Sequence, residues 1–173
     1  MKTLPLRTMA ASLIAVIGFV ACNVAPAATP RDADAAALMS QARQFLDAYA
    51  ANDQRTALKM IDPQHFTMYG SDVAEIAHGS AGLRQFMDED HRLWRAAKFG
   101  AIEHFDSRAG TEYAGAFFDV PFSVGGAAPV PVRVSTVWHK VGSQWLLTQS
   151  SNCVPTTGSS ASEALHKQDQ PRK

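Results

Sequence analysis

The feature that most constrains the fold is a change of pattern near residue 99. From there on, four segments have the pattern of strands: 99–106, 113–124, 130–141 and 144–152. The turns between them carry glycine, at Gly110, at Gly125-Gly126 and at Gly142. Because short turns join antiparallel neighbours, this pattern predicts a four-stranded antiparallel sheet in the second half of the chain.

The first half instead spaces its apolar residues as helices do. A first helix is expected to run to about residue 51 from Asp32 or Asp34, either of which can cap it. Its apolar stripe consists of Leu38, Ala42, Phe45, Leu46 and Tyr49. Asp53 is expected to cap a short second helix that ends at Pro63, and a third should run from Gly79 to about residue 97.

A short hairpin is expected between the second and third helices. Segments 65–69 and 73–78 flank the turn sequence Gly70-Ser71-Asp72. Three helices and a hairpin, followed by the four strands, predict an α+β domain in which the helices pack on one curved, mainly antiparallel sheet. We expect this domain at residues 36–155, after a tether at 29–35 and before a flexible polar tail at 156–173.

The N-terminus has the pattern of a secretory signal. Lys2 and Arg7 precede an apolar run at 9–20, and small residues follow it. A run of about twelve residues is too short to cross a bilayer as a helix, which needs about twenty. We therefore expect residues 1–28 to be a signal peptide and the protein to be exported to the periplasm.

Two processing routes remain open. Ala25-Pro26-Ala27 resembles the A-x-A site of ordinary signal peptidase, whereas Phe19-Val20-Ala21-Cys22 resembles a bacterial lipobox. In the second case Cys22 would be lipidated. The resemblance then implies an outer-membrane lipoprotein, because Asn23 is not the aspartate that retains lipoproteins in the inner membrane. The lipid anchor on Cys22 would be the expected membrane contact.

Charge and cysteine content argue against several classes of function. Residues 29–173 contain 14 basic and 16 acidic residues, a net charge near −2, without a basic block. We therefore expect no nucleic-acid binding. Without Cys22, Cys153 is the only cysteine, so the exported domain would depend on its core rather than on a disulfide. No histidine or cysteine spacing matches a metal site, and we expect neither a metal nor a cofactor.

Four motifs follow one another in the order of a known family. They are the segment 45–53, which holds the opening helix and the aspartate that follows it, the segment 79–86 with the pattern G-x-x-x-[IL]-R-x-[FY], Tyr113-Ala114-Gly115, and a last hairpin at 137–147 with its turn and Trp145. Over residues 36–153 the chain resembles the SnoaL-like members of the nuclear transport factor 2-like (cystatin-like) superfamily. The resemblance implies a curved sheet and helices that form a cone with an internal pocket.

That superfamily hosts many activities, so the resemblance does not fix one. Its members include ketosteroid isomerases, polyketide cyclases, limonene epoxide hydrolases, dehydratases and binding modules without chemistry. Many relatives carry a histidine pair in the last strand, within W-x-[IL]-x-H-x-H-x-S. Here those positions hold Gln149 and Ser151, and Cys153 replaces the serine. A mechanism that needs the histidine pair is therefore not expected.

Two aspartates are the candidate catalytic residues. Asp90 lies four residues after Phe86 and four before Trp94, inside the apolar stripe of the third helix, where it faces either a cavity or the solvated edge of the helix. In a cavity, loss of solvent would raise its pKa and suit it to act as a general base. Asp119 shares a strand face with Phe117, and alternation alone does not say whether that face is inward.

Two functions remain open. We favour a periplasmic module that binds a small apolar ligand or a partner without catalysis, because the histidine pair is missing. The alternative is an isomerase, cyclase or epoxide-hydrolase-type enzyme with Asp90 or Asp119 as general base. The family resemblance also implies a homodimer through the sheet. In either case we expect the pocket to be lined by Tyr49, Tyr69, Phe86, Trp94, Phe117, Trp138, Gln149 and Ser151.

Overall fold

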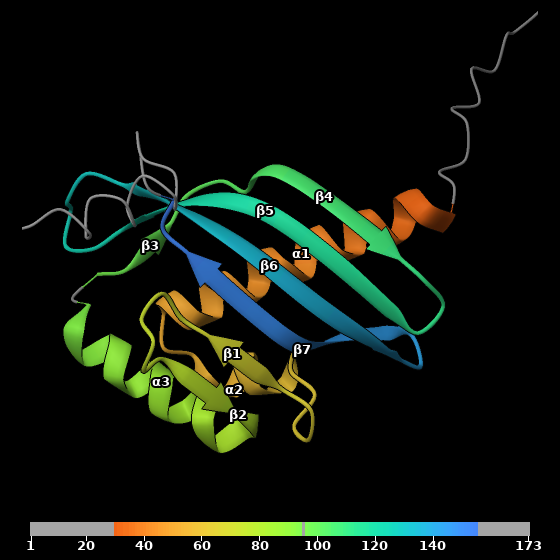
Figure 1. Ribbon diagram of the computed structural model, residues 1–173, viewed down its shortest axis with the longest axis horizontal. Coiled ribbons are helices and arrows are strands. Elements are labelled where there is room, and N and C mark those ends of the chain that lie inside the picture. The colour runs from red at the N-terminus through yellow and green to blue at the C-terminus, as the bar shows by residue number, and fades with distance from the viewer. Residues whose placement is uncertain (1–29, 95, 156–173) are drawn as a thin grey trace, which may run out of the picture.

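The computed structural model describes residues 30–94 and 96–155 (Figure 1). The expected signal peptide, the lipidation site Cys22 and the tail at 156–173 lie outside the described residues and stay predictions. The helices are α1 (Pro30–Ala50), α2 (Gln54–Lys59) and α3 (Gly79–Leu93). The strands are β1 (Thr67–Tyr69), β2 (Ile76–His78), β3 (Lys98–Phe99), β4 (Glu103–Ala109), β5 (Tyr113–Ser123), β6 (Val130–Val141) and β7 (Gln144–Cys153).

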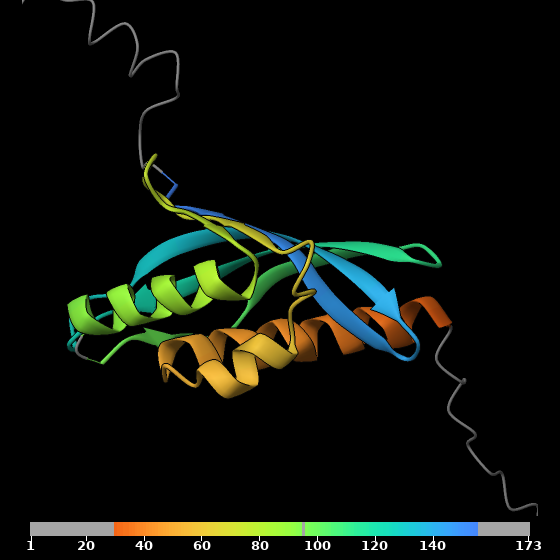
Figure 2. The ribbon, with the colours of Figure 1, turned by 90° about the horizontal axis from the view of Figure 1, so that it is seen from below.

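These strands form one curved sheet, and all three helices lie on one side of it (Figure 2). The strand order is β2-β1-β7-β6-β5-β3, with β4 also paired to β5. Neighbours are antiparallel except β1 and β7, which run parallel. The predicted α+β class with a curved, mainly antiparallel sheet is confirmed. None of the described helices combines the length and the apolar character needed to cross a membrane.

Three helix boundaries differ from the expectation. Helix α2 ends at Lys59, before the expected end at Pro63. Helix α1 begins at Pro30, so residues 30–35 of the expected tether are helical. Asp34 does not cap the helix: its Oδ1 accepts hydrogen bonds from Lys140 Nζ at 3.2 Å and from Trp145 Nε1 at 3.3 Å, which tie α1 to the last hairpin. Helix α3 ends at Leu93 instead of residue 97, because the backbone of Trp94 is extended.

The inner face of the sheet carries the even-numbered residues of β5 and β6. In β5 the buried residues are Ala114, Ala116, Phe118 and Val120, and in β6 they are Val132, Val134, Thr136 and Trp138. Trp138 is completely buried, and its Nε1 donates a hydrogen bond to Thr136 Oγ1 at 2.8 Å. The odd-numbered residues of both strands therefore face outward.

A β-bulge at Thr148 changes which residues of β7 face inward. Val137 pairs with Gln149, but the next residue of β6, Trp138, pairs with Leu147, so Thr148 is an extra residue in β7. Before the bulge, Leu147 is buried; after it, Ser150 is buried and Gln149 is exposed. Inward positions thus switch from odd to even numbers within one strand.

Candidate active site

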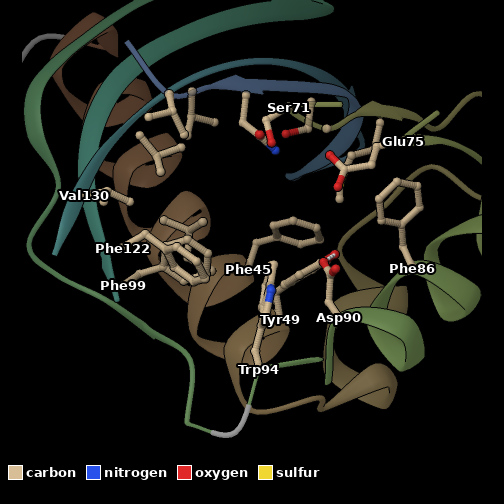
Figure 3. Close-up of a pocket in the computed structure, with 18 residues that line it drawn as sticks. Phe45, Tyr49, Ser71, Glu75, Phe86, Asp90, Trp94, Phe99, Phe122 and Val130 are labelled. Atoms are coloured by element: carbon tan, nitrogen blue, oxygen red, sulfur yellow. Dashed lines mark hydrogen bonds between the residues drawn. The ribbon is translucent and has the colours of Figure 1, made fainter. Parts of the chain in front are cut away.

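A cavity of about 340 Å³ lies between α1, α3, the β1–β2 turn and the inner face of the sheet (Figure 3). Its apolar lining consists of Phe45, Leu46, Met68, Phe86, Trp94, Phe99, Phe122, Val130, Val132, Val134 and Val154. Its polar lining consists of Tyr49, Ser71, Glu75, Asp90, Ser150 and Asn152, together with the backbone of Gly70. The cavity is therefore mostly apolar, with a few polar groups, as is typical of small-molecule sites.

A hydrogen bond between Tyr49 and Asp90 crosses this cavity from α1 to α3. The Tyr49 hydroxyl donates to Asp90 Oδ2 at 2.5 Å. Tyr49 is only 8% exposed, and its ring lies 6.1 Å from the rings of Phe45 and Trp94, measured between centroids. Phe45 on α1 and Trp94, directly after α3, thus hold the ring of the tyrosine that orients the carboxylate.

The environment of Asp90 raises the pKa of its carboxyl group. Partial burial is the largest cause, because it disfavours the charged form, and the negative charges of Glu75 and Glu89 act in the same direction. The hydrogen bond from Tyr49 opposes them and lowers the pKa in part. Burial and the nearby Asp90 also raise the pKa of Tyr49, so its hydroxyl stays protonated and remains a donor. A carboxylate with a raised pKa is suited to accept and return a proton.

Glu75 is the second carboxylate of the cavity, and the β1–β2 turn holds it in place. The backbone N–H of Asp72 donates to Glu75 Oε2 at 2.9 Å, and that of Gly70 donates to the Glu75 carbonyl at 2.8 Å. A Cβ atom at Gly70 would lie only 2.6 Å from Glu75 Cβ. Glycine at position 70 therefore allows the Glu75 side chain to fold over the turn and point into the cavity (Figure 3).

The other candidate aspartate, Asp119, lies on the outer face of the sheet and not in this cavity. Its Oδ1 accepts a hydrogen bond from Arg133 Nε at 2.9 Å, and its Oδ2 lies 3.2 Å from His104 Nδ1. The hydrogen bond from Arg133 is the largest cause of its lowered pKa, and His104 contributes. Asp119 is thus held in its charged form by partners that already occupy its oxygens.

The structure places three of the expected pocket residues in the cavity: Tyr49, Phe86 and Trp94. The other five do not line it: Tyr69, Phe117, Trp138, Gln149 and Ser151. Trp138 belongs to the core, and Tyr69 and Phe117 are exposed. Gln149 is also exposed, because the bulge at Thr148 turns Ser150 inward in its place. Phe117 and Ser151, like Asp119, line a shallow depression on the outer face.

Four polar lining residues were not expected from the sequence: Ser71, Glu75, Ser150 and Asn152. The alternation of β7 would have indicated Ser150 and Asn152 only if the bulge had been recognised, and a bulge at Thr148 has no local sequence signal. Glu75 follows a recognisable turn, but its inward direction depends on Gly70 across that turn. Within the described residues, no group of three or more His, Cys, Asp and Glu side chains is arranged to hold a metal ion.

The chain resembles known proteins in its fold rather than in its sequence. No protein-family model matches it, and no curated protein matches it significantly. Solved structures do match: an NTF2-like protein of unknown function from Pseudomonas putida KT2440 superposes with a TM-score of 0.64, at 11% identity, over 76% of this chain and 92% of its own. The chain has the nuclear transport factor 2-like, or cystatin-like, fold.

Two further structures agree with the cystatin-like fold. A protein of unknown function from Nostoc punctiforme PCC 73102 gives a TM-score of 0.63 at 16% identity, over 72% of this chain and 93% of its own. A candidate dehydratase of the NTF2-like family from Streptomyces avermitilis gives a TM-score of 0.64 at 10% identity, over 73% of this chain and 99% of its own. At these identities the likeness establishes the fold alone, and proteins that share a cystatin-like fold differ in activity.

Proposed function

We propose that the cavity binds a small, largely apolar molecule and that Asp90 acts on it as a general base. The observation that carries this proposal is the hydrogen bond between Tyr49 and Asp90 inside an apolar cavity, where the carboxyl has a raised pKa. General bases work best when their pKa lies nearer the operating pH than that of an ordinary carboxylate.

The proposed step is a proton transfer next to a carbonyl group. One oxygen of the Asp90 carboxylate takes a proton from the α-carbon of the substrate, and the electron pair of the broken C–H bond moves to the carbonyl oxygen as an enolate. With a β,γ-unsaturated ketone, Asp90 then returns the proton to the γ-carbon of the dienolate, and the double bond moves into conjugation. With a β-hydroxy ketone, the enolate electron pair forms the new C=C bond while the β-hydroxyl group takes the proton and leaves as water. Ser150 and Asn152 on the sheet side of the cavity supply polar groups for the enolate oxygen.

Two structural neighbours carry names that are compatible with such chemistry. One is the candidate dehydratase from Streptomyces avermitilis, and another is a candidate ketosteroid isomerase from Parabacteroides distasonis ATCC 8503, with a TM-score of 0.55 at 14% identity over 69% of this chain and 86% of its own. These names describe those proteins. The proposal for this chain depends on the geometry of Asp90 and Tyr49.

A second candidate function is ligand binding without chemistry. The observation that favours it is that the Tyr49 hydroxyl donates to Asp90 and is therefore engaged before a substrate arrives. The other polar residues expected to line the pocket, Tyr69, Gln149 and Ser151, lie outside the cavity. Asp90 would then only recognise a polar group of the ligand.

Exchange of carbon-bound protons separates the two functions. The purified protein is incubated in D₂O with a panel of small cyclic and aromatic ketones, and loss of α-proton signals is followed by NMR. We expect Asp90→Asn to slow the exchange by about 10²- to 10⁴-fold, because the amide cannot accept the proton. We expect Asp119→Asn to leave the rate unchanged, because Asp119 lies on the outer face. An equal rate in Asp90→Asn would contradict the proposal, and binding of ketones without exchange would favour the second function.

A further inference from the structure

We propose that the ligand of this cavity carries a protonated amine, that Glu75 binds the ammonium group, and that the apolar end of the cavity holds the rest of the molecule. This inference depends on the proposed role of the cavity as a ligand site. It adds the chemical class of the ligand and a recognition residue that is separate from the proposed base, Asp90.

The charge of the lining is the first argument. Two lining residues are acidic, Glu75 and Asp90, and none of the described lining residues is Lys, Arg or His. Like charges in a partly buried site repel each other more strongly than in water. An ammonium group would remove this repulsion, whereas a carboxylate or phosphate group would increase it.

The placement of Glu75 is the second argument. Exposed glutamates usually extend into solvent, but this side chain folds back over Gly70, where any side chain larger than glycine would collide with it. The backbone N–H of Asp72 fixes Oε2, and the carboxylate points into the cavity (Figure 3). The negative charge of Glu75 acts unfavourably on the charged form of Asp90, and a cation bound between the two carboxylates would relieve this repulsion.

The aromatic walls are the third argument. Phe86 lies near both carboxylates. Phe86, Glu75 and Asp90 line the cavity together, and all three also line an adjoining groove between α3 and β2. Tyr49 and Trp94 flank Asp90 on the other side. Aromatic faces attract cations, most of all where solvent is excluded.

The opposite end of the cavity is apolar and suits a hydrophobic body. Phe122 lies 4.8 Å from Trp94 and 4.9 Å from Phe99 between ring centroids, and Val130 and Val132 close this end from the sheet. A molecule that fits both ends is therefore an amphiphile with one amine and an apolar chain or ring. Asp90, between the two ends, would remain the base.

Three probes that share one skeleton test this inference: phenylbutylamine, phenylbutanol and phenylbutyrate. Binding to the full-length protein is measured by titration calorimetry near neutral pH. We expect the amine to bind at least about tenfold more tightly than the alcohol, and the carboxylate to bind most weakly. Glu75→Gln should weaken amine binding about tenfold and leave alcohol binding unchanged. Gly70→Ala, which displaces the Glu75 side chain, should act in the same direction.

Glu112→Gln is the matched control, because it removes the same charge from an exposed position outside the cavity. Equal weakening of amine binding by Glu75→Gln and Glu112→Gln would mean that only net charge matters, and it would overturn the inference. Equal affinity of the wild-type protein for amine and alcohol would also overturn it, but would leave the proposed ligand site intact. Failure of all three probes to bind would count against both the inference and the proposed function.

Discussion

Aspartates on the two sides of the sheet have opposite pKa shifts. On the helix side, Asp90 is partly buried in an apolar cavity with one neutral donor, Tyr49, and its pKa is raised. On the outer face, Asp119 contacts the Arg133 guanidinium and the His104 ring at the solvent-exposed surface, and its pKa is lowered. Loss of solvent dominates in the first case and a charged partner in the second. The side of the sheet, rather than the residue type, decides whether the pKa of the carboxyl group is raised or lowered.

The largest effect should come from a tryptophan on the inner face. Trp138→Ala removes a completely buried ring and should lower the free energy of unfolding by about 3–5 kcal/mol. Phe117→Ala, on the outer face and 53% exposed, should change it by about 0.5 kcal/mol or less. Urea unfolding of both variants measures the difference. A large cost for Phe117→Ala would mean that the outer face is covered in solution, as the homodimer expected from the family resemblance requires.

A smaller effect is expected from Tyr49→Phe, which removes the donor to Asp90. Because that hydrogen bond lowers the pKa of Asp90, its loss should move this pKa further above the ordinary value of 3.8. Loss of one buried hydrogen bond should also cost about 1–2 kcal/mol of unfolding free energy. Carboxyl carbon shifts, followed by NMR as the pH is changed, measure the pKa directly.

The sign of the pH dependence follows from the raised pKa. The folded state holds a proton on Asp90 more readily than the unfolded state does, so stability falls as pH rises from about 3.8 to the raised pKa. In Tyr49→Phe this window should extend to higher pH. An Asp90 pKa at or below the ordinary value in the variant would contradict the assignment of burial as the dominant cause.

Local periodicity explains which parts of this comparison could be predicted from the sequence. Strand β6 has the expected bounds of 130–141, because it is flanked by Gly125-Gly126 and Gly142. Helical spacing likewise placed Asp90 between Phe86 and Trp94, and all three line the cavity. These features depend on residues within a few positions of one another.

The remaining features depend on contacts between distant segments. Which face of β5 is inward is decided by the helices that cover the sheet, so alternation alone could not separate Phe117 and Asp119 from their buried neighbours. The extra residue Thr148 is defined only by its pairing with β6, and it moves Gln149 out of the cavity. Inward and outward residues alternate on both sides of the bulge, so the sequence of β7 does not show where the inward positions change from odd to even numbers.

The smallest effect should come from the outer face. Arg133→Gln removes the main cause of the lowered pKa of Asp119, so this pKa should rise toward 3.8. A carboxyl group with a lowered pKa stabilises the folded state when the pH is above the ordinary pKa, and this stabilisation is lost as the pH falls through the folded-state pKa. The variant should therefore lose less stability in acid than the wild-type protein. Because surface ion pairs are weak and screened by salt, the unfolding midpoint near neutral pH should hardly move.

The same NMR titration should leave Asp90 unchanged in Arg133→Gln, since the sheet separates the two carboxylates and they share no hydrogen-bond partner among the described residues. A shift of the Asp90 pKa in this variant would mean that the charge on one face influences the other. In that case the raised pKa of Asp90 would no longer be a property of the cavity alone, and the outer cluster would have to be included in any account of its proton transfer.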